Sequence, residues 1–308
     1  MSFFLGDPSG ARKAVEDSAD AFDKVEHHES AFTYGHDLLV SCLGILSQLL
    51  WSLGLLDEAF SRHRRMLALA RRLSHLNTLG AALFYSASLH ALCRNGTEVE
   101  SSADELLAIG GEHKLVLWSA VGTYFKGWAM ADAGQSADGC KLMEDGLLAL
   151  KTIRSGQYRP LFLTWLASFY CRFHQKARGL TLLDEARSFM DSGGELWAEP
   201  EFYVVKSQLL MLTGDSGRNC AEAEACAKKA LDIARAQKSV SQEVRSATNL
   251  ARIWRDAGKM REAEALVNQV CASIPEEINS RDLQEARAVL EELGHALRTG
   301  SELERAKR

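Results

Sequence analysis

Three arginines in one stretch of the chain have the spacing and the chemistry of an anion-binding site. Arg245, Arg252 and Arg255 are separated by seven and three residues, so a helix would carry them close together on its surface. A guanidinium group binds a carboxylate through two parallel hydrogen bonds. Together with Thr248 and Asn249, these arginines predict a partner-binding face that clamps an acidic peptide or a carboxylate. The alternative is a solvated, charged helix face, since acidic neighbours would partly neutralise the patch.

Motifs for metal binding, nucleophilic catalysis and phosphate binding are missing from the sequence. The run His27-His28-Glu29 supplies too few ligands for a metal site. Gly258-Lys259 is followed by Met260 and lacks the upstream glycine of a phosphate-binding loop. Neither H-E-x-x-H nor G-x-S-x-G occurs. The sequence therefore predicts no catalytic residue, no cofactor and no metal, and a protein that is not an enzyme.

The cysteines favour a structural role. The chain has seven of them, an odd number, and no two form a C-x-x-C pair. Scattered single cysteines are typical of reduced thiols that pack as small apolar side chains. Because disulfides are rare in reducing compartments, this pattern predicts a cytoplasmic protein.

A repeat of about forty residues organises the chain that must position these groups. Gly54, Arg94, Gly134, His174 and Gly214 lie 40 residues apart, and Gly258 follows 44 residues later. Each follows a long, partly apolar helical pattern. Self-similarity at such a period is the signature of stacked helical repeats. With only four prolines in the chain, it predicts an all-α fold, a right-handed α-solenoid of helix-turn-helix units.

Residues 240–273 form the clearest unit. A first helix to residue 257, a turn at Gly258 and a second helix from Met260 resemble the tetratricopeptide (TPR) pattern. Small residues at the paired positions of the two helices let their backbones approach closely. Gly127 and Gly139 occupy these positions in another unit and predict a tight helix crossing, because glycine in a helix otherwise costs about 1 kcal/mol. The TPR residues are Leu250, Ala251, Trp254, Ala263 and Pro275.

The repeat divides the chain into four expected parts. Residues 1–35 read as a half-repeat whose first helix is missing, residues 36–275 as about six units, residues 276–298 as a capping helix and residues 299–308 as a flexible tail. The start suggests a truncated relative of a longer protein, or a segment cut from one. The apolar face of the first helix predicts self-association or docking of a missing helix; it consists of Ala14, Val15, Ala19 and Phe22.

Charge and hydropathy exclude several classes of partner. The net charge is −5 and the pI is near 6, so we expect no nucleic-acid partner. Residues 38–56 contain 19 uncharged residues, close to the length of a membrane span. Several polar residues interrupt them and no lysine or arginine lies nearby, which favours a buried helix and no membrane partner.

The six tryptophans are interpreted mainly as core residues, with a concave aromatic groove as the alternative.

The chain also resembles one group of bacterial proteins over nearly its whole length. The group is the C-terminal TPR-like region of multidomain proteins that carry a class III adenylate/guanylate cyclase domain, or a DNA-binding domain, followed by an AAA-type ATPase. Residues 269–279 depart from the group, which usually has an aromatic-containing linker there. The stretches that carry the resemblance are YGHDLLVSCLGILSQLLWSLGLLDEA (34–59), GWAMADAG (127–134), GLTLLDEA (179–186), ELWAEPEFYVVKSQLLMLTGD (195–215), AEAEACAKKALDIARAQKS (221–239), SATNLARIWRDAGKMREAEALV (246–267) and SRDLQEARAVLEEL (280–293).

This resemblance implies a role in protein binding, or in regulating an associated cyclase/ATPase signalling protein. The catalytic domains of the group have no counterpart in this chain, so their chemistry does not transfer to it. The alternative is an effector-sensing solenoid that binds a small molecule in its concave groove. A closed pocket with converging polar groups would favour the effector, and a long open groove would favour a peptide.

Overall fold

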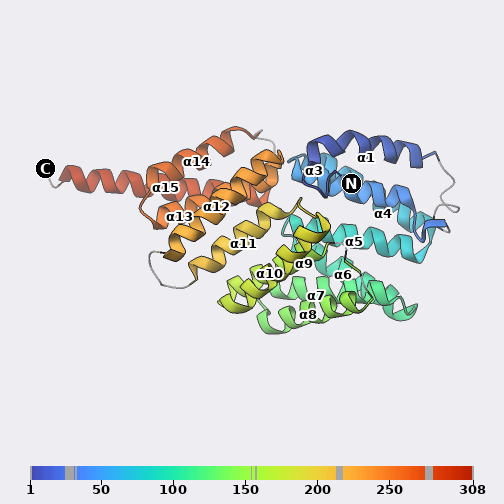
Figure 1. The fold of residues 1–308 in the computed structure, drawn as a ribbon. Helices are drawn as coiled ribbons and strands as arrows, with labels where there is room; N and C mark the ends of the chain where they lie inside the picture. Colours follow the sequence, from blue (N-terminus) through green and yellow to red (C-terminus); the bar gives the residue numbers. More distant parts are fainter. Residues whose placement is uncertain are drawn as a thin grey trace. The chain divides into compact units, whose positions relative to one another are not determined.

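The computed structural model describes residues 2–24, 31, 33–153, 155–156, 158–212, 218–274 and 280–306. These residues fold into 14 α-helices and contain no strand, which confirms the all-α prediction (Figure 1). The chain divides into two compact units, Met1–Leu196 and Trp197–Arg308.

Unit 1 contains nine of the described helices. They are α1 (Pro8–Phe22), α3 (Leu38–Ser52), α4 (Leu56–Leu73), α5 (Leu76–Leu92), α6 (Gly96–Glu112), α7 (Val116–Asp132), α8 (Ser136–Thr152), α9 (Arg159–Arg172) and α10 (Lys176–Gly193). Unit 2 contains the other five. They are α11 (Glu199–Met211), α12 (Arg218–Ala236), α13 (Val240–Asp256), α14 (Met260–Ala272) and α15 (Arg281–Ala306).

Successive helices pack as antiparallel pairs of the TPR type. In unit 1 the pairs are α3–α4, α5–α6, α7–α8 and α9–α10, and in unit 2 they are α11–α12 and α13–α14. We call the first helix of each pair an A helix and the second a B helix. A helices also contact the A helices of neighbouring pairs, α3 with α5 and α5 with α7 in unit 1, and α11 with α13 in unit 2. Helix α1 packs on α3 as a preceding B helix would, and α15 packs on α13 and α14.

The predicted forty-residue positions are the turns between A and B helices. Gly54, Arg94, Gly134, His174 and Gly258 all have a positive φ, between 56° and 93°. At the first turn, Gly54 donates to the Trp51 carbonyl at 2.9 Å and Leu55 donates to the Leu50 carbonyl at 2.9 Å. This Schellman arrangement ends a helix by placing one residue in the left-handed region. Gly214 lies outside the described residues.

A second series of turns has the same period but was not indicated by the sequence. Ser74 and Lys114 lie 40 residues apart and have φ values of 53° and 54°, and Gly194 and Lys238 close later B helices in the same way. At one of these turns the Leu115 amide donates to the Gly110 carbonyl at 2.9 Å. Three of these four residues are polar and have a side chain, so their left-handed conformation leaves little trace in the sequence.

The tight crossing predicted at Gly127 and Gly139 is confirmed. A Cβ atom added to Gly127 would lie 2.5 Å from the Gly139 carbonyl oxygen and 2.6 Å from the Met143 amide nitrogen. A Cβ atom on Gly139 would lie 2.5 Å from the Ala131 nitrogen. Backbone meets backbone here, so only glycine lets α7 and α8 come this close.

The apolar stretch at residues 38–56 is a buried A helix and its turn, as predicted. Most residues of α3 are buried, among them Trp51 at 2% exposure. Across the described residues, none of the helices combines the length and the apolar content that a membrane span needs. The tryptophans are mainly core residues; Trp118, Trp128, Trp165 and Trp197 are buried, and Trp254 is half-buried.

Residues 299–306, predicted as part of a flexible tail, belong to α15, which continues through Thr299 and Gly300 to Ala306. A glycine inside a helix costs only about 1 kcal/mol relative to alanine, far less than the proline that would stop it.

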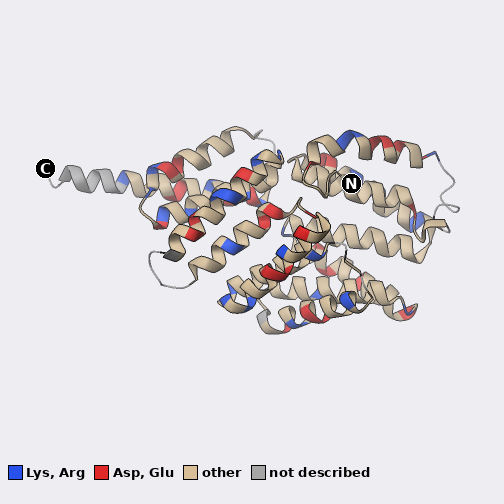
Figure 2. Ribbon diagram, viewed as in Figure 1, with Lys and Arg blue, Asp and Glu red and all other residues tan. Residues whose placement is uncertain are grey.

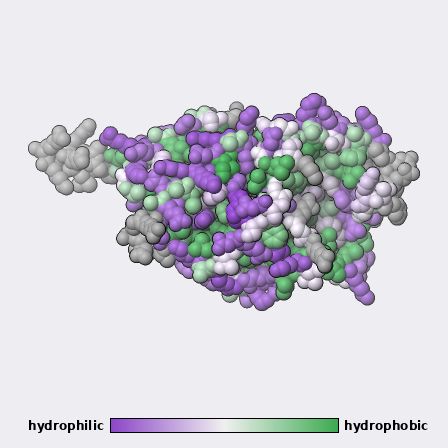
Figure 3. Space-filling model, in the orientation of Figure 1, coloured by the Kyte–Doolittle hydropathy of each residue, from purple (hydrophilic) through white to green (hydrophobic). Residues whose placement is uncertain are grey.

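Charged residues of both signs are distributed along the helices of each unit, as Figure 2 shows, and hydrophilic and hydrophobic residues are interspersed on the face seen in Figure 3.

Two buried histidines form part of the core of unit 1. His63 of α4 and His90 of α5 have ring centroids 5.1 Å apart and are 7% and 8% exposed. The His63 Nε2 lies 3.0 Å from the Ser86 hydroxyl, which lies 3.0 Å from the Ser102 hydroxyl. Burial lowers the pKa of His63 to about 4, with smaller contributions from His90 and Arg64. The imidazole is therefore neutral at pH 7.

We expect unit 1 to lose stability as the pH falls from about 6.5 towards 4. Over this range the unfolded chain binds a proton at His63 that the folded chain does not, so protonation favours unfolding. The loss should be about 2 kcal/mol after allowance for solvent screening. Urea unfolding at pH 7 and pH 4.5 measures it, and a His63→Gln variant should show a weaker pH dependence. Identical pH profiles for the two proteins would contradict the expectation.

Candidate functional site

The five predicted partner-binding residues all lie on α13 of unit 2. This A helix packs its apolar residues, including Val244 and Leu250, into the core of the unit. The preceding A helix, α11, and the last helix, α15, both contact α13. Helix α15 therefore covers part of the α13 surface that would otherwise lie at the open end of the stack.

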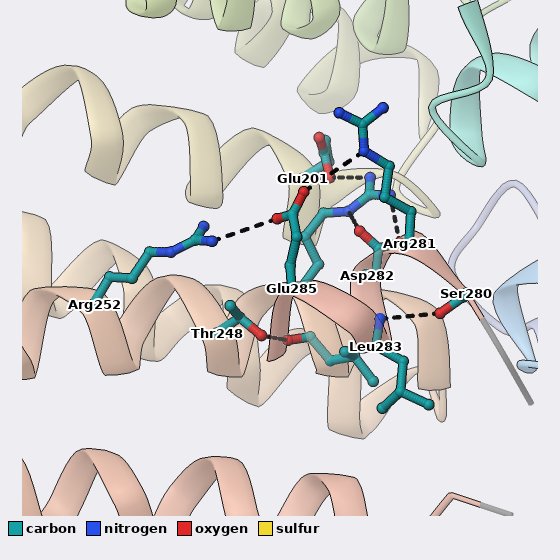
Figure 4. Close-up of polar contacts among 10 residues, drawn as sticks. Glu201, Thr248, Arg252, Ser280, Arg281, Asp282, Leu283 and Glu285 are labelled. Carbon is teal, nitrogen blue, oxygen red and sulfur yellow. Dashed lines mark hydrogen bonds and ion pairs between the residues drawn. The ribbon is translucent and has the colours of Figure 1, made fainter. Parts of the chain in front are cut away.

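Arg245 is buried in an ion network that joins three helices. Its side chain donates to Asp282 of α15 through Nε and Nη2, at 3.0 and 2.8 Å from Oδ1 and Oδ2. Nη1 donates to Glu201 Oε2 of α11 at 2.8 Å. All three residues are less than 9% exposed, and Figure 4 shows Glu201 and Asp282 close together. Burial by itself would lower the pKa of Arg245, but the two carboxylates raise it above its ordinary value.

Thr248 and Asn249 are also buried and bound within unit 2. The Thr248 hydroxyl donates to the Val244 carbonyl at 2.7 Å. The Asn249 amide donates to the Ser207 hydroxyl at 2.7 Å and accepts from Gln208 Nε2 at 3.2 Å. The Asn249 hydrogen bonds tie α13 to α11, whereas the Thr248 hydrogen bond lies within α13. Both side chains are therefore occupied inside unit 2.

The two remaining arginines pair with acidic residues of α15. Arg252 lies 3.5 Å from Glu285, and Arg255 lies 2.7 Å from Glu292 and 3.0 Å from Asp256 (Figure 4 draws the first pair). Their side chains are 41% and 33% exposed. The three arginines of α13 thus face a row of acids on α15, and the acidic helix that they clamp is part of this chain. Binding of a separate partner by Arg252 and Arg255 stays a prediction.

A cavity of about 270 Å³ lies on the A helices of unit 1. Its walls come from the segment before α3, from α3 itself, from α5 and from the start of α7. The lining residues are Gly35, His36, Ser41, Asn77, Ala81, Phe84, Tyr85, Leu117 and Trp118. A pocket of this size is slightly smaller than the 300–1,000 Å³ typical of drug-sized ligand sites.

Two glycines let aromatic rings form the walls of this cavity. A Cβ atom on Gly44 of α3 would lie 2.3 Å from the Tyr85 ring, and one on Gly80 of α5 would lie 2.4 Å from the Trp118 ring. Each ring therefore lies directly on the backbone of the preceding A helix. The Trp118 indole also donates to the Asn77 side-chain oxygen at 3.0 Å. The sequence gives no sign that the Trp118 ring contacts Gly80, because the two residues meet only when α5 and α7 pack.

The polar groups of the cavity are uncharged. Burial raises the pKa of Tyr85 to about 12, so its hydroxyl keeps its proton. Burial lowers the pKa of His36, which favours a neutral imidazole. No lining residue is Asp, Glu, Lys or Arg. The cavity therefore combines apolar rings with hydroxyl, amide and imidazole groups that can exchange hydrogen bonds with a neutral ligand.

The run His27-His28-Glu29 lies outside the described residues. Within the part of the chain that the structure describes, no group of three or more His, Cys, Asp or Glu side chains is arranged to hold a metal ion.

No family model matches the sequence. A curated relative, uncharacterized protein R02095 of Rhizobium meliloti (strain 1021), is 26% identical over 171 residues, which cover 53% of this chain and 16% of that protein. The match thus spans about a sixth of the relative's length. The crystal structure of the apo form of RapI is similar in fold, with a TM-score of 0.57 and 13% identity, over 94% of this chain and 97% of the other. The chain therefore has a TPR-like helical repeat fold.

Proposed function

We propose that this chain is a non-catalytic repeat module that binds a polypeptide partner on the A-helix face of unit 1. The observation that supports this most is the position of two of its exposed apolar side chains. Tyr34 and Val116 are each 60% exposed, and they directly precede Gly35 and Leu117, which line the cavity. Exposed apolar residues beside a concave site are characteristic of interaction surfaces.

We further propose that the partner is a cyclase- or ATPase-containing signalling protein, bound in the cytoplasm. The sequence resemblance to the repeat region of such proteins supports this. The much greater length of the Rhizobium meliloti relative is compatible with repeats of this kind working beside other domains. Self-association through α1 stays a prediction; Ala11 and Ala19 are buried, while Ala14 is exposed and Val15 and Phe22 are half-buried.

Photocrosslinking in the source cell tests the proposal. A benzoylphenylalanine at position 34 or 116 should capture one main polypeptide, identified by mass spectrometry as carrying a cyclase or ATPase domain. The matched control is the same substitution at Leu148 of α8, which is 64% exposed but far along the chain from the cavity lining. Equal capture from position 148, or no capture from positions 34 and 116, would contradict the proposed face.

The second candidate is an effector-sensing solenoid, and the cavity of unit 1 favours it. Uncharged polar groups and apolar rings line a space of about 270 Å³, enough for a small molecule. If a free small molecule fills this cavity in the cell, the module responds to a metabolite rather than to a polypeptide.

A further inference from the structure

We infer that the cavity of unit 1 takes one aromatic ring bearing an N–H or O–H group, the side chain of a tyrosine or tryptophan in the partner. The inference rests on the proposed polypeptide-binding function and names the chemistry that this face recognises. The ring enters between Tyr85 and Trp118, beside the exposed Tyr34 and Val116.

The cavity walls are prepared for a planar ligand. Tyr85 and Trp118 are 6% and 8% exposed, and each lies on a glycine of the preceding A helix. Hydrogen bonding of the Trp118 indole to Asn77 holds the second ring in place. Rigid aromatic walls bind a ring without first losing side-chain freedom, which lowers the entropic cost of binding.

The floor of the cavity is also fixed. Phe84, which lines it, makes an edge contact with the ring of the buried Tyr158, with centroids 4.9 Å apart. The Tyr158 hydroxyl donates to Gln48 Oε1 of α3 at 2.6 Å. The Gln48 Nε2 atom is buried without a described hydrogen-bond partner. The core behind Phe84 is therefore packed, and the hydrogen bond between Tyr158 and Gln48 fixes its position next to α3.

The polar lining selects the kind of ring. The Ser41 and Tyr85 hydroxyls interact, and His36 and Asn77 add one neutral imidazole and one amide. These groups can accept a hydrogen bond from a phenol or an indole. A charged ligand would lose its hydration without finding a counter-ion, because no charged side chain lines the cavity. An aliphatic side chain would offer these groups no hydrogen bond.

Fluorine NMR on the full chain tests this inference. The probes are the peptide acetyl-Gly-(5-fluoro-Trp)-Gly-amide and free 5-fluoroindole. The fluorine resonance of the peptide should broaden and shift as protein is added until the change saturates. The dissociation constant should be on the order of 1 mM or lower. Acetyl-Gly-cyclohexylalanine-Gly-amide should compete at least about tenfold more weakly, because it has the bulk but neither the aromatic ring nor the N–H.

Two variants locate the binding. Ala81→Leu fills the cavity and should weaken peptide binding about tenfold or more, whereas Ala177→Leu, on an exposed hollow beside Tyr170, should leave it unchanged. Circular dichroism checks that both are folded. If Ala81→Leu fails to fold, the inference is still tested on the unaltered chain, by comparing the binding of the fluorotryptophan peptide with that of the cyclohexylalanine peptide.

The outcomes separate this inference from the proposed function. Binding of the fluorotryptophan peptide that Ala81→Leu weakens supports it. If the chain binds 5-fluoroindole but not the fluorotryptophan peptide, the ring does not come from a polypeptide, and the inference is overturned. Binding of neither probe, or equal binding of the cyclohexylalanine peptide, overturns the inference even where photocrosslinking from positions 34 and 116 captures a partner. Ring binding without any crosslinked partner would instead contradict the proposed function.

Discussion

Replacing Arg245 with methionine should lower the free energy of unfolding of unit 2 by about 3–5 kcal/mol, because the change removes the guanidinium that binds two buried carboxylates. Asp282 and Glu201 are 6% and 8% exposed and lie 2.8 Å from the guanidinium. Neither can recover its hydration without opening the contacts among α11, α13 and α15. Urea unfolding of the full chain measures the loss, and hydrogen exchange in residues 199–306 assigns it to unit 2.

Arg252→Met is the matched control. Arg252 lies on the same helix and pairs with α15, but its side chain is 41% exposed and its ion pair spans 3.5 Å. An exposed pair of this kind contributes about 0–1 kcal/mol. A second test replaces all three buried partners together, Arg245→Met, Glu201→Leu and Asp282→Leu, which should recover most of the loss. If Arg245→Met and Arg252→Met lower the free energy of unfolding equally, burial does not determine how much the ion network contributes to stability.

The substitution Gly127→Ala should destabilise unit 1 by about 2–3 kcal/mol, although alanine is the better helix former. The new methyl group would lie 2.5 Å from the Gly139 carbonyl oxygen and 2.6 Å from the Met143 nitrogen. Both are backbone atoms, so α7 and α8 must move apart to admit it. Thermal unfolding followed by circular dichroism measures the change.

Gly111→Ala should have the opposite sign. Gly111 lies in the last turn of α6, and a Cβ atom there would meet nothing within 4 Å. The substitution should stabilise the chain by about 0.5–1 kcal/mol through helix propensity alone. If both substitutions stabilise the protein, the close crossing of α7 and α8 does not restrict residue 127.

Local signals in the sequence were sufficient to predict the repeat. Gly54, Gly134 and Gly258 mark turns because a left-handed residue at a helix end favours glycine, and apolar periodicity fills the helices between them. Gly127 and Gly139 predicted a tight crossing because a glycine in the middle of a helix needs a compensating contact. The second set of turns, at Ser74, Lys114 and Lys238, escaped prediction because no glycine marks them, whereas glycine marks most turns of the first set.

The sequence by itself determined the helices, their pairing in units of about forty residues and the affinity of the α13 arginines for acids. Only the tertiary structure decided which acids these are: α15 supplies Asp282, Glu285 and Glu292, so the predicted clamp closes on the chain itself. Likewise, only the packing of α5 on α7 lays Trp118 on Gly80 and forms a cavity wall. Helix and turn signals act over a few residues, whereas ion partners and cavities join residues some forty positions apart, whose meeting depends on how successive repeats stack.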